Sequence, residues 1–274
     1  MSTSRSHPTV QGAESPDLLA DVALRVVTEA GEAAKRGLPR LRGGEGGVVV
    51  KGGNSADVVT GIDRGLDVLI RQRLHELRPC DGIVSEEGED APGTSEIIWV
   101  CDPIDGSASL VHGGGSWAIS LAATYHGESL AGVVSDVEAD ETYVAKLGGG
   151  ANLNGRPIHV SAAATLAESV IATDFAHDRA LRASQAEVLG RVASRARAMR
   201  NVGSTVLHLC WVASGRLDGM WQTTGKCWDV AAAGLCVTEA GGVLSDLDGG
   251  PMRPEAVVAC APEIHRELID AVAI

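Results

Sequence analysis

The chain has 274 residues and a net charge of −13, and 45% of its residues are hydrophobic, enough for one large domain or two of ordinary size. This acidic balance argues against nucleic acid and anionic membranes as partners, because both attract basic surfaces. It leaves phosphate esters open as substrates, since bound metal ions can reverse the local charge of an acidic site.

The N-terminal residues and the cysteines indicate the cellular compartment of the protein. Residues 1–16 are polar and lack the apolar core of a signal peptide, so we expect a disordered leader. No apolar run reaches the roughly 18 residues of a membrane span. The six cysteines show no CxxC spacing, which favours reduced, buried thiols in a cytoplasmic protein. They are Cys80, Cys101, Cys210, Cys227, Cys236 and Cys260.

The first part of the chain predicts two helices around a Gly-rich segment. Apolar residues recur at helical spacing over 16–36 and again over 63–77, so both segments are expected to be amphipathic helices. Residues 37–53 between them are rich in Gly, with a short strand at 48–50. Such a segment is typically ordered by a ligand.

Strands dominate the next part. A strand at 82–85 ends at Glu86 and Glu87, and an apolar strand at 97–100 is expected to stop abruptly at Pro103. An antiparallel meander and an Asn-Gly turn at 154–155 follow. The expected meander strands are 118–125, 130–137 and 141–144.

Strands and helices then alternate to the C-terminus, which predicts a layered α/β architecture. The two halves, residues 17–160 and 161–274, are expected to pack against each other across a cleft. The expected strands of the second half are 169–173, 243–246 and 256–260. The expected helices are 180–197, 206–213, 228–240 and 262–272.

The sequence Asp102-Pro103-Ile104-Asp105-Gly106-Ser107 directly follows the apolar strand. It is expected to expose two carboxylates, three residues apart, on a backbone restricted by Pro and permitted by Gly. Their repulsion would be relieved by a hard divalent cation with oxygen ligands. The alternative is an ordinary surface Asp-Pro turn.

Further carboxylates lie at the ends of other apolar segments: Glu86 and Glu87, Asp229, and Asp57 and Asp63 beside Thr60. Together with the acidic turn they suggest an oxygen-ligand cage for two or more Mg2+ ions. Two adjacent metals suit displacement at phosphorus, and a neighbouring hydroxyl, Ser107 or Thr60, could orient the attacking water. Asp229 and Asp63 could instead be helix caps.

Signatures of other chemistries are absent from the sequence. It contains no GxSxG, no HExxH and no GxxxxGK[ST] phosphate loop. The run Gly113-Gly114-Gly115 is interpreted as a flexible loop rather than a phosphate cradle.

With these residues in hand, the sequence closely resembles the inositol monophosphatase family of lithium-sensitive, magnesium-dependent phosphomonoesterases. The family turn Asp-Pro-Ile-Asp-Gly-Thr is matched by residues 102–107. The signature Trp-Asp, an Ala-rich helix and Glu-Ala-Gly-Gly is matched by residues 228–242. The Glu-Glu pair, Lys51 and the segment 57–63 follow in the family's order, so the resemblance runs from about residue 17 to the C-terminus.

The resemblance implies a five-layered αβαβα sandwich, usually a homodimer, and it implies roles for the site residues. A first metal would be held by Glu86, Asp102 and the carbonyl of Ile104, and a second by Asp102, Asp105 and Asp229. Glu86 would also reach a third, weaker ion through water. Asp63 and Ser107 would position the attacking water, and the amides of Gly106 and Ser107 would bind phosphate.

Some positions depart from the family pattern. Ser107 replaces Thr and keeps the hydroxyl, whereas Ser109 and Leu110 replace Asn and Phe. Where inositol-binding members carry an acidic residue seven places before the Trp-Asp aspartate, this chain has Gln222, which can donate as well as accept hydrogen bonds. The other residues expected to line the substrate pocket are Asp174, His177, Asp178, Ser204 and Thr205; His177 could equally be a surface residue.

The expected function is a Mg2+-dependent phosphatase that hydrolyses a small phosphomonoester by in-line attack of a metal-activated water. Mn2+ is expected to substitute for Mg2+, and Li+ or Ca2+ to inhibit. Inositol, aminocyclitol, histidinol, sugar and nucleotide phosphates are all open as substrates. A bisphosphatase is the alternative within the fold, with Lys226, Arg179 and Arg216 as candidate basic residues. A metal-binding relic with weak activity is the alternative from another class.

Overall fold

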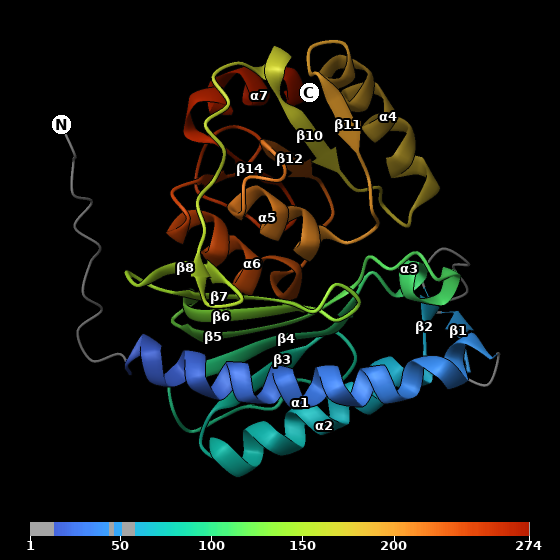
Figure 1. Cartoon of the computed structure of the whole chain (residues 1–274), viewed down its shortest axis with the longest axis vertical. Coiled ribbons are helices and arrows are strands. Elements are labelled where there is room, and N and C mark those ends of the chain that lie inside the picture. Colours follow the sequence, from blue (N-terminus) through green and yellow to red (C-terminus); the bar gives the residue numbers. More distant parts are fainter. Residues whose placement is uncertain (1–13, 44–46, 51–57, 274) are drawn as a thin grey trace.

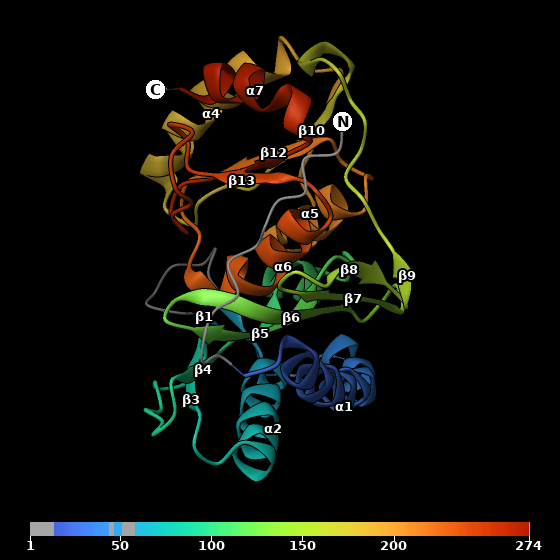
Figure 2. The same ribbon diagram turned by 90° about the vertical axis from the view of Figure 1, so that its left-hand side faces the viewer.

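The structure is a computed structural model that describes residues 14–43, 47–50 and 58–273. Lys51, Asp57 and most of the expected leader lie outside these ranges. Helices and sheets alternate in five layers, which confirms the expected αβαβα sandwich (Figures 1 and 2). Among the described residues, no helix is both long and apolar enough to cross a membrane.

Two long helices form the first layer, α1 (Pro16–Arg42) and α2 (Gly61–Leu77). Pro16 occupies the first turn of α1, where a missing N–H costs nothing. The helix continues past residue 36, where it was expected to end, because Leu38 and Leu41 keep the apolar period and are buried. Gly37 brings α1 close to α2: a Cβ there would lie 3.2 Å from Ile62.

The second layer is a seven-stranded sheet in the order β3-β4-β5-β6-β7-β8-β9. The meander β5-β6-β7 is antiparallel as expected, and β8 and β9 form a hairpin around Asn154 and Gly155. Both turn residues have positive φ, as such a hairpin requires. The strands are β3 (Gly82–Ser85), β4 (Ile97–Asp105), β5 (Ala118–Tyr125), β6 (Glu128–Asp136), β7 (Glu141–Lys146), β8 (Gly150–Leu153) and β9 (Arg156–Pro157).

The expected stop of β4 at Pro103 is wrong. The strand runs on to Asp105, which still pairs with β5, and the register shifts between Asp102 and Asp105. Its other neighbour, β3, pairs only as far as Cys101, so the missing N–H of Pro103 falls at an edge and a bulge, where Pro is tolerated.

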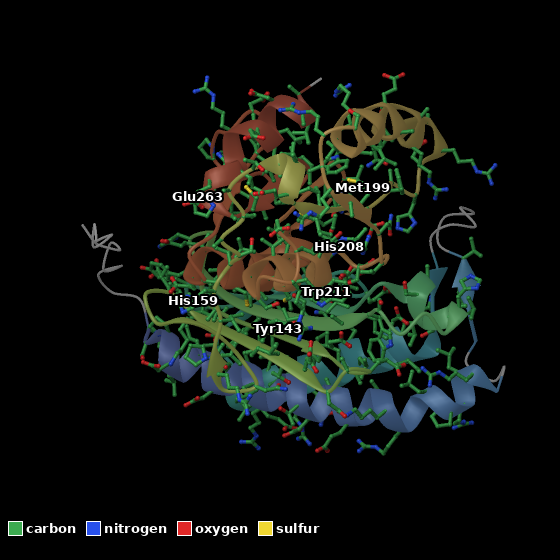
Figure 3. All side chains as sticks on the ribbon, turned by 45° about the horizontal axis from the view of Figure 1, so that its top comes forward. Tyr143, His159, Met199, His208, Trp211 and Glu263 are labelled. Atoms are coloured by element: carbon green, nitrogen blue, oxygen red, sulfur yellow. The ribbon has the colours of Figure 1, made fainter. Side chains whose placement is uncertain are left out.

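The middle layer holds α5 (Thr205–Ala213) and α6 (Cys227–Glu239), which separate the two sheets. Helix α6 lies very close to β6, since a Cβ at Gly132 would be 2.8 Å from the Cα of Ala232. Figure 3 shows the side chains of His208 and Trp211 extending from α5, near Tyr143 of β7 in that view. The small buried side chains of α6, such as Ala232 and Ala233, allow this close packing with few aromatic residues in the core.

The second sheet has the order β11-β10-β12-β14-β13, and its far face is covered by α4 and α7. The expected helix at 180–197 ends earlier, and residues 198–200 form a strand. The elements are β10 (Val170–Thr173), α4 (Arg179–Ala193), β11 (Ala198–Arg200), β12 (Gly219–Gln222), β13 (Val243–Ser245), β14 (Val257–Cys260) and α7 (His265–Val272).

Short elements complete the chain. They are β1 (Val49–Val50), which pairs with β2 (Val58–Val59), the helix α3 (Ser107–His112), and the 3-10 turns Leu166–Glu168 and Pro262–Ile264. All six cysteines are free. Four are buried as expected, but Cys80 and Cys227 are exposed, because one lies in the turn after α2 and the other opens α6.

Candidate active site

A cavity of about 540 Å3 opens where the end of β4 and the N-terminus of α6 meet the ends of β10 and β12. It brings together side chains from both sheets and from the helices between them. Its lining includes Glu86, Asp102, Ile104, Asp105, Gly106, Ser107, Asp174, Phe175, His177, Arg182, Thr205, Gln222, Thr224, Lys226, Trp228 and Asp229.

The bulged end of β4 supplies two carboxylates to this cavity. Successive residues of a regular strand alternate between faces, so residues three apart would point to opposite sides. The register shift removes that conflict for Asp102 and Asp105. The turn was expected to expose both groups, but Asp102 is only 1% exposed because the sandwich covers the end of the strand.

Hydrogen bonds fix both carboxylates of the turn. Asp102 Oδ1 accepts from the amide of Ile104 at 3.0 Å. Asp105 Oδ2 accepts from the amide of Val206 at 2.8 Å and from the hydroxyl of Ser204, which caps α5. Ser204 was expected to line the cavity. It is not part of the lining and instead orients Asp105 by this hydrogen bond.

Asp229 is both a helix cap and a member of the acidic cluster. It occupies the third position of α6, and its Oδ2 accepts from the amide of Lys226 at 2.7 Å. Carboxylate oxygens of Asp102, Asp105 and Asp229 nevertheless lie within 4.8 Å of one another. Three carboxylates at this separation could hold a metal ion.

The electrostatics of the cluster favour a cation. Burial, followed by the charges of neighbouring carboxylates, raises the pKa of both Asp102 and Asp105. Burial also raises the pKa of Asp229 to about 7, with Glu86 and Asp174 adding to the effect. Buried carboxylates whose ionisation is this unfavourable are stabilised by a positive charge among them.

Ser107 and Asp63 meet at the edge of the cavity. Ser107 Oγ lies 2.6 Å from Asp63 Oδ1 and 3.1 Å from the carbonyl oxygen of Ile104. The other oxygen of Asp63 accepts from the amide of Thr60 at 2.9 Å, closing a capping box at the start of α2. Of the two candidate hydroxyls, Ser107 lines the cavity, whereas Thr60 caps the helix.

Gly106 occupies a position that only glycine fits. Its φ is +91°, and a Cβ would lie 2.9 Å from the carbonyl oxygens of Gly203 and Ser116. It precedes Ser107, the first residue of α3, so both amides lie at a helix start beside the cavity.

The opposite wall comes from the second sheet. Gln222 ends β12, and its Oε1 accepts from the hydroxyl of Thr205. Asp174 follows β10, and its burial raises its pKa. His177 lines the cavity, but Asp178 is instead the N-cap of α4, accepting from the amide of Ala180 at 2.7 Å.

The basic residues of the cavity differ in part from those expected. Lys226 lines it, and so does Arg182, which sequence reasoning missed. Arg182 belongs to α4 and donates to the carbonyl of Ala176, a contact that no sequence motif indicates. Arg179 is not part of the lining, and Arg216 forms two 2.6 Å hydrogen bonds with Glu141 elsewhere.

Comparisons with known proteins identify the family of the chain. The family model described as "Inositol monophosphatase family" matches residues 15–273. The chain belongs to the inositol monophosphatase family. It is a phosphoric monoester hydrolase of the inositol-1-monophosphatase type.

Relatives and solved structures match nearly the whole chain. Inositol-1-monophosphatase of Rhizobium meliloti is 35% identical over 93% of this chain and 96% of its own. The suhB protein of Bartonella henselae is 32% identical, with a TM-score of 0.88 over 93% of this chain and 98% of its own. An IMPase/NADP phosphatase complexed with Mg2+ and phosphate has the same fold, at 22% identity and a TM-score of 0.81, over 94% and 96%.

Two departures from the family pattern, Ser109 and Leu110, have structural roles in this inositol monophosphatase family member. Leu110 is the buried residue of α3 and packs into the hydrophobic core. Ser109 Oγ donates to the carbonyl of Val202 at 3.0 Å and so ties α3 to the loop before α5. These contacts anchor the helix that follows the acidic turn.

Proposed function

We propose that the chain is a Mg2+-dependent phosphatase that hydrolyses a small phosphomonoester by in-line attack of a metal-activated water. The observation that carries this proposal is the convergence of Asp102, Asp105 and Asp229 on one point of the cavity. Carboxylates and a backbone carbonyl are the donors that Mg2+ prefers, so the residues present fit this ion.

The proposed ligand roles follow from the placement of the residues. Glu86, Asp102 and the carbonyl of Ile104 would hold one ion. Asp102, Asp105 and Asp229 would hold a second, and Glu86 would reach a third through water. When bound, such ions supply a hydroxide at neutral pH and neutralise the leaving oxygen. Mn2+ would substitute, and Li+ or Ca2+ would inhibit.

The remaining chemistry belongs to side chains and amides of the chain. Ser107 donates its proton toward Asp63 and thereby directs a lone pair of its oxygen to a water in the cavity. The amide of Thr60, at the N-terminus of α2, donates to Asp63 and holds its carboxylate in this position. The amides of Gly106 and Ser107 would bind the phosphate, as amides at a helix start can.

Gln222, Thr205 and Asp174 would contact the alcohol part of the substrate. The cavity of about 540 Å3 suits an inositol, cyclitol, histidinol or sugar phosphate. A bisphosphate is the second candidate, and the presence of both Lys226 and Arg182 in the lining favours it. We also propose a homodimer, and a cytoplasmic location, which six unpaired cysteines support.

A phosphate-release assay over cyclitol, amino-alcohol, sugar and nucleotide phosphates tests the proposal. Asp102→Asn and Asp229→Asn should each lower turnover by at least about 10²-fold at saturating Mg2+, since even outer-shell changes cost 10- to 100-fold. Asp178→Asn is the control, because it makes the same change outside the cavity.

Wild-type turnover in Asp102→Asn or Asp229→Asn would show the mechanism to be wrong. Mg2+ binding by calorimetry without phosphate release from any substrate would favour a metal-binding relic. A preference for substrates with two phosphates would favour the bisphosphatase.

A further inference from the structure

An ion pair on α2 lies directly behind the loop that carries Glu86 into the cavity. Arg71 Nε donates to Asp67 Oδ2 at 2.7 Å, and Arg71 Nη1 donates to the carbonyl of Glu89 at 2.9 Å. The side chains are 20% and 9% exposed, respectively. The pair therefore joins α2 to the far end of the loop from a largely dry position.

The same pair also holds the near end of the loop. Ser85, the last residue of β3, donates from Oγ to Asp67 Oδ1 at 2.6 Å. The next residue, Glu86, donates its amide to the carbonyl of Cys101 at 3.3 Å. Asp67 thus binds the residue before Glu86, while Arg71 binds the residue three places after it.

Gly88 shows how closely the guanidinium approaches the loop backbone. A Cβ at Gly88 would lie 2.4 Å from Arg71 Nη2, so a side chain there would displace the guanidinium. Nη2 itself is buried and has no hydrogen-bond partner among the described residues. A buried donor without a partner is unfavourable, so the position of this guanidinium lowers the stability of the fold.

We propose that Asp67 and Arg71 are positioning residues that hold the segment 85–89 so that Glu86 faces Asp102 before a metal ion binds. This inference rests on the proposed function, since it concerns the affinity of the Mg2+ site. Outer partners of this kind orient metal ligands and tune the affinity of the site.

Mg2+ binding to Arg71→Met, measured by calorimetry and by the shift in melting temperature, tests the inference without any substrate. The affinity should fall about tenfold or more, as for other outer-shell changes. Turnover at saturating Mg2+ should fall much less, because the ligands themselves remain. Arg73→Met is the matched control: Arg73 lies on the same helix, but it pairs with Glu29 and Glu76 away from the loop.

Gly88→Ala perturbs the same contact from the loop side and serves if Arg71→Met does not fold. As a single substitution, Gly88→Ala should weaken Mg2+ binding. The double variant Gly88→Ala/Arg71→Met should bind Mg2+ no more weakly than Arg71→Met does, because both changes act on one contact. Arg71→Lys should recover part of the affinity, since Lys keeps the charge but cannot bond both Asp67 and Glu89.

Wild-type Mg2+ affinity in both Arg71→Met and Gly88→Ala would overturn the inference while leaving the phosphatase proposal intact. An equal loss in Arg73→Met would also overturn it, because the effect would then be general to α2. A wild-type chain that binds no Mg2+ would overturn the proposed function and the inference together.

Discussion

Asp63 and Asp229 each support a helix start and the cavity at once. Both occupy the third position of a helix, and in each one oxygen accepts the amide of the capping residue. A carboxylate has two oxygens, so the second is left for Ser107 in one case and for the acidic cluster in the other. The sequence offers helix capping and a role in the site as alternatives for Asp63 and Asp229. The geometry shows that one carboxylate can serve both.

Most residues of the candidate site could be named from the sequence because they stand in short motifs. Arg182, Asp67 and Arg71 could not, because their partners are set by how helices pack on distant loops. Asp178 and Ser204, which are also expected in the pocket, are instead the N-caps of α4 and α5. Each side chain accepts a hydrogen bond from an amide of the helix that it caps, and neither lines the cavity.

The hydroxyl of Ser107 makes a prediction for a single residue. Ser107→Ala should lower kcat by about 10²-fold, because a positioned group that takes part in proton transfer typically contributes at least that much. Ser107→Thr keeps the hydroxyl and should remain close to wild type in kcat. Steady-state kinetics at saturating Mg2+ measures both. Equal kcat values for Ser107→Ala and wild type would exclude a role for the hydroxyl.

Elements with a clear apolar segment were predicted well, including the buried α5 and β14. The helices α1 and α2 carry a helical apolar period, and turn residues separate the strands of the meander β5–β7. In contrast, β12 has only two apolar residues, Met220 and Trp221, and α3 is too short to show a period. The end of β4 was missed because Pro103 normally ends a strand, and only its place at a bulge permits it.

The contact between α6 and β6 makes a prediction about stability. Gly132→Ala should destabilise the protein by about 1–3 kcal/mol, since the new methyl group would overlap Ala232 in a packed core. Gly190→Ala is the matched control: it lies in the exposed part of α4 with no atom within 4 Å of the new Cβ. There the substitution should stabilise by about 0.5–1 kcal/mol. Chemical denaturation of both variants measures these changes, and equal effects would contradict the close packing.

At the scale of the whole molecule, the acidic cluster links stability to both metal and pH. Without metal, Asp229 has a pKa of about 7 in the folded chain against 3.8 ordinarily. The unfolded chain therefore binds fewer protons than the folded chain between these values. The contribution of Asp229 to stability is present below about pH 4 and is lost as the pH rises through 7.

In EDTA, Asp229→Asn should therefore be more stable than wild type at pH 8, and the difference should close as the pH falls toward 4. Saturating Mg2+ should reverse the order at pH 8, because only wild type retains the full ligand set. Melting temperatures of both proteins across this pH range give the comparison. A wild-type protein that is the more stable of the two in EDTA at pH 8 would show that the cluster is not strained without metal.

Helix α6 also joins segments far apart in the chain. Ser120 and Ser129 of the first sheet donate to carbonyls of Trp228 and Ala231, which fixes Asp229 over the end of β4. During synthesis, Asp102 and Asp105 leave the ribosome long before Asp229 does. The nascent chain must therefore carry an incomplete acidic cluster until α6 emerges and docks, and chains that end before α6 cannot assemble the site.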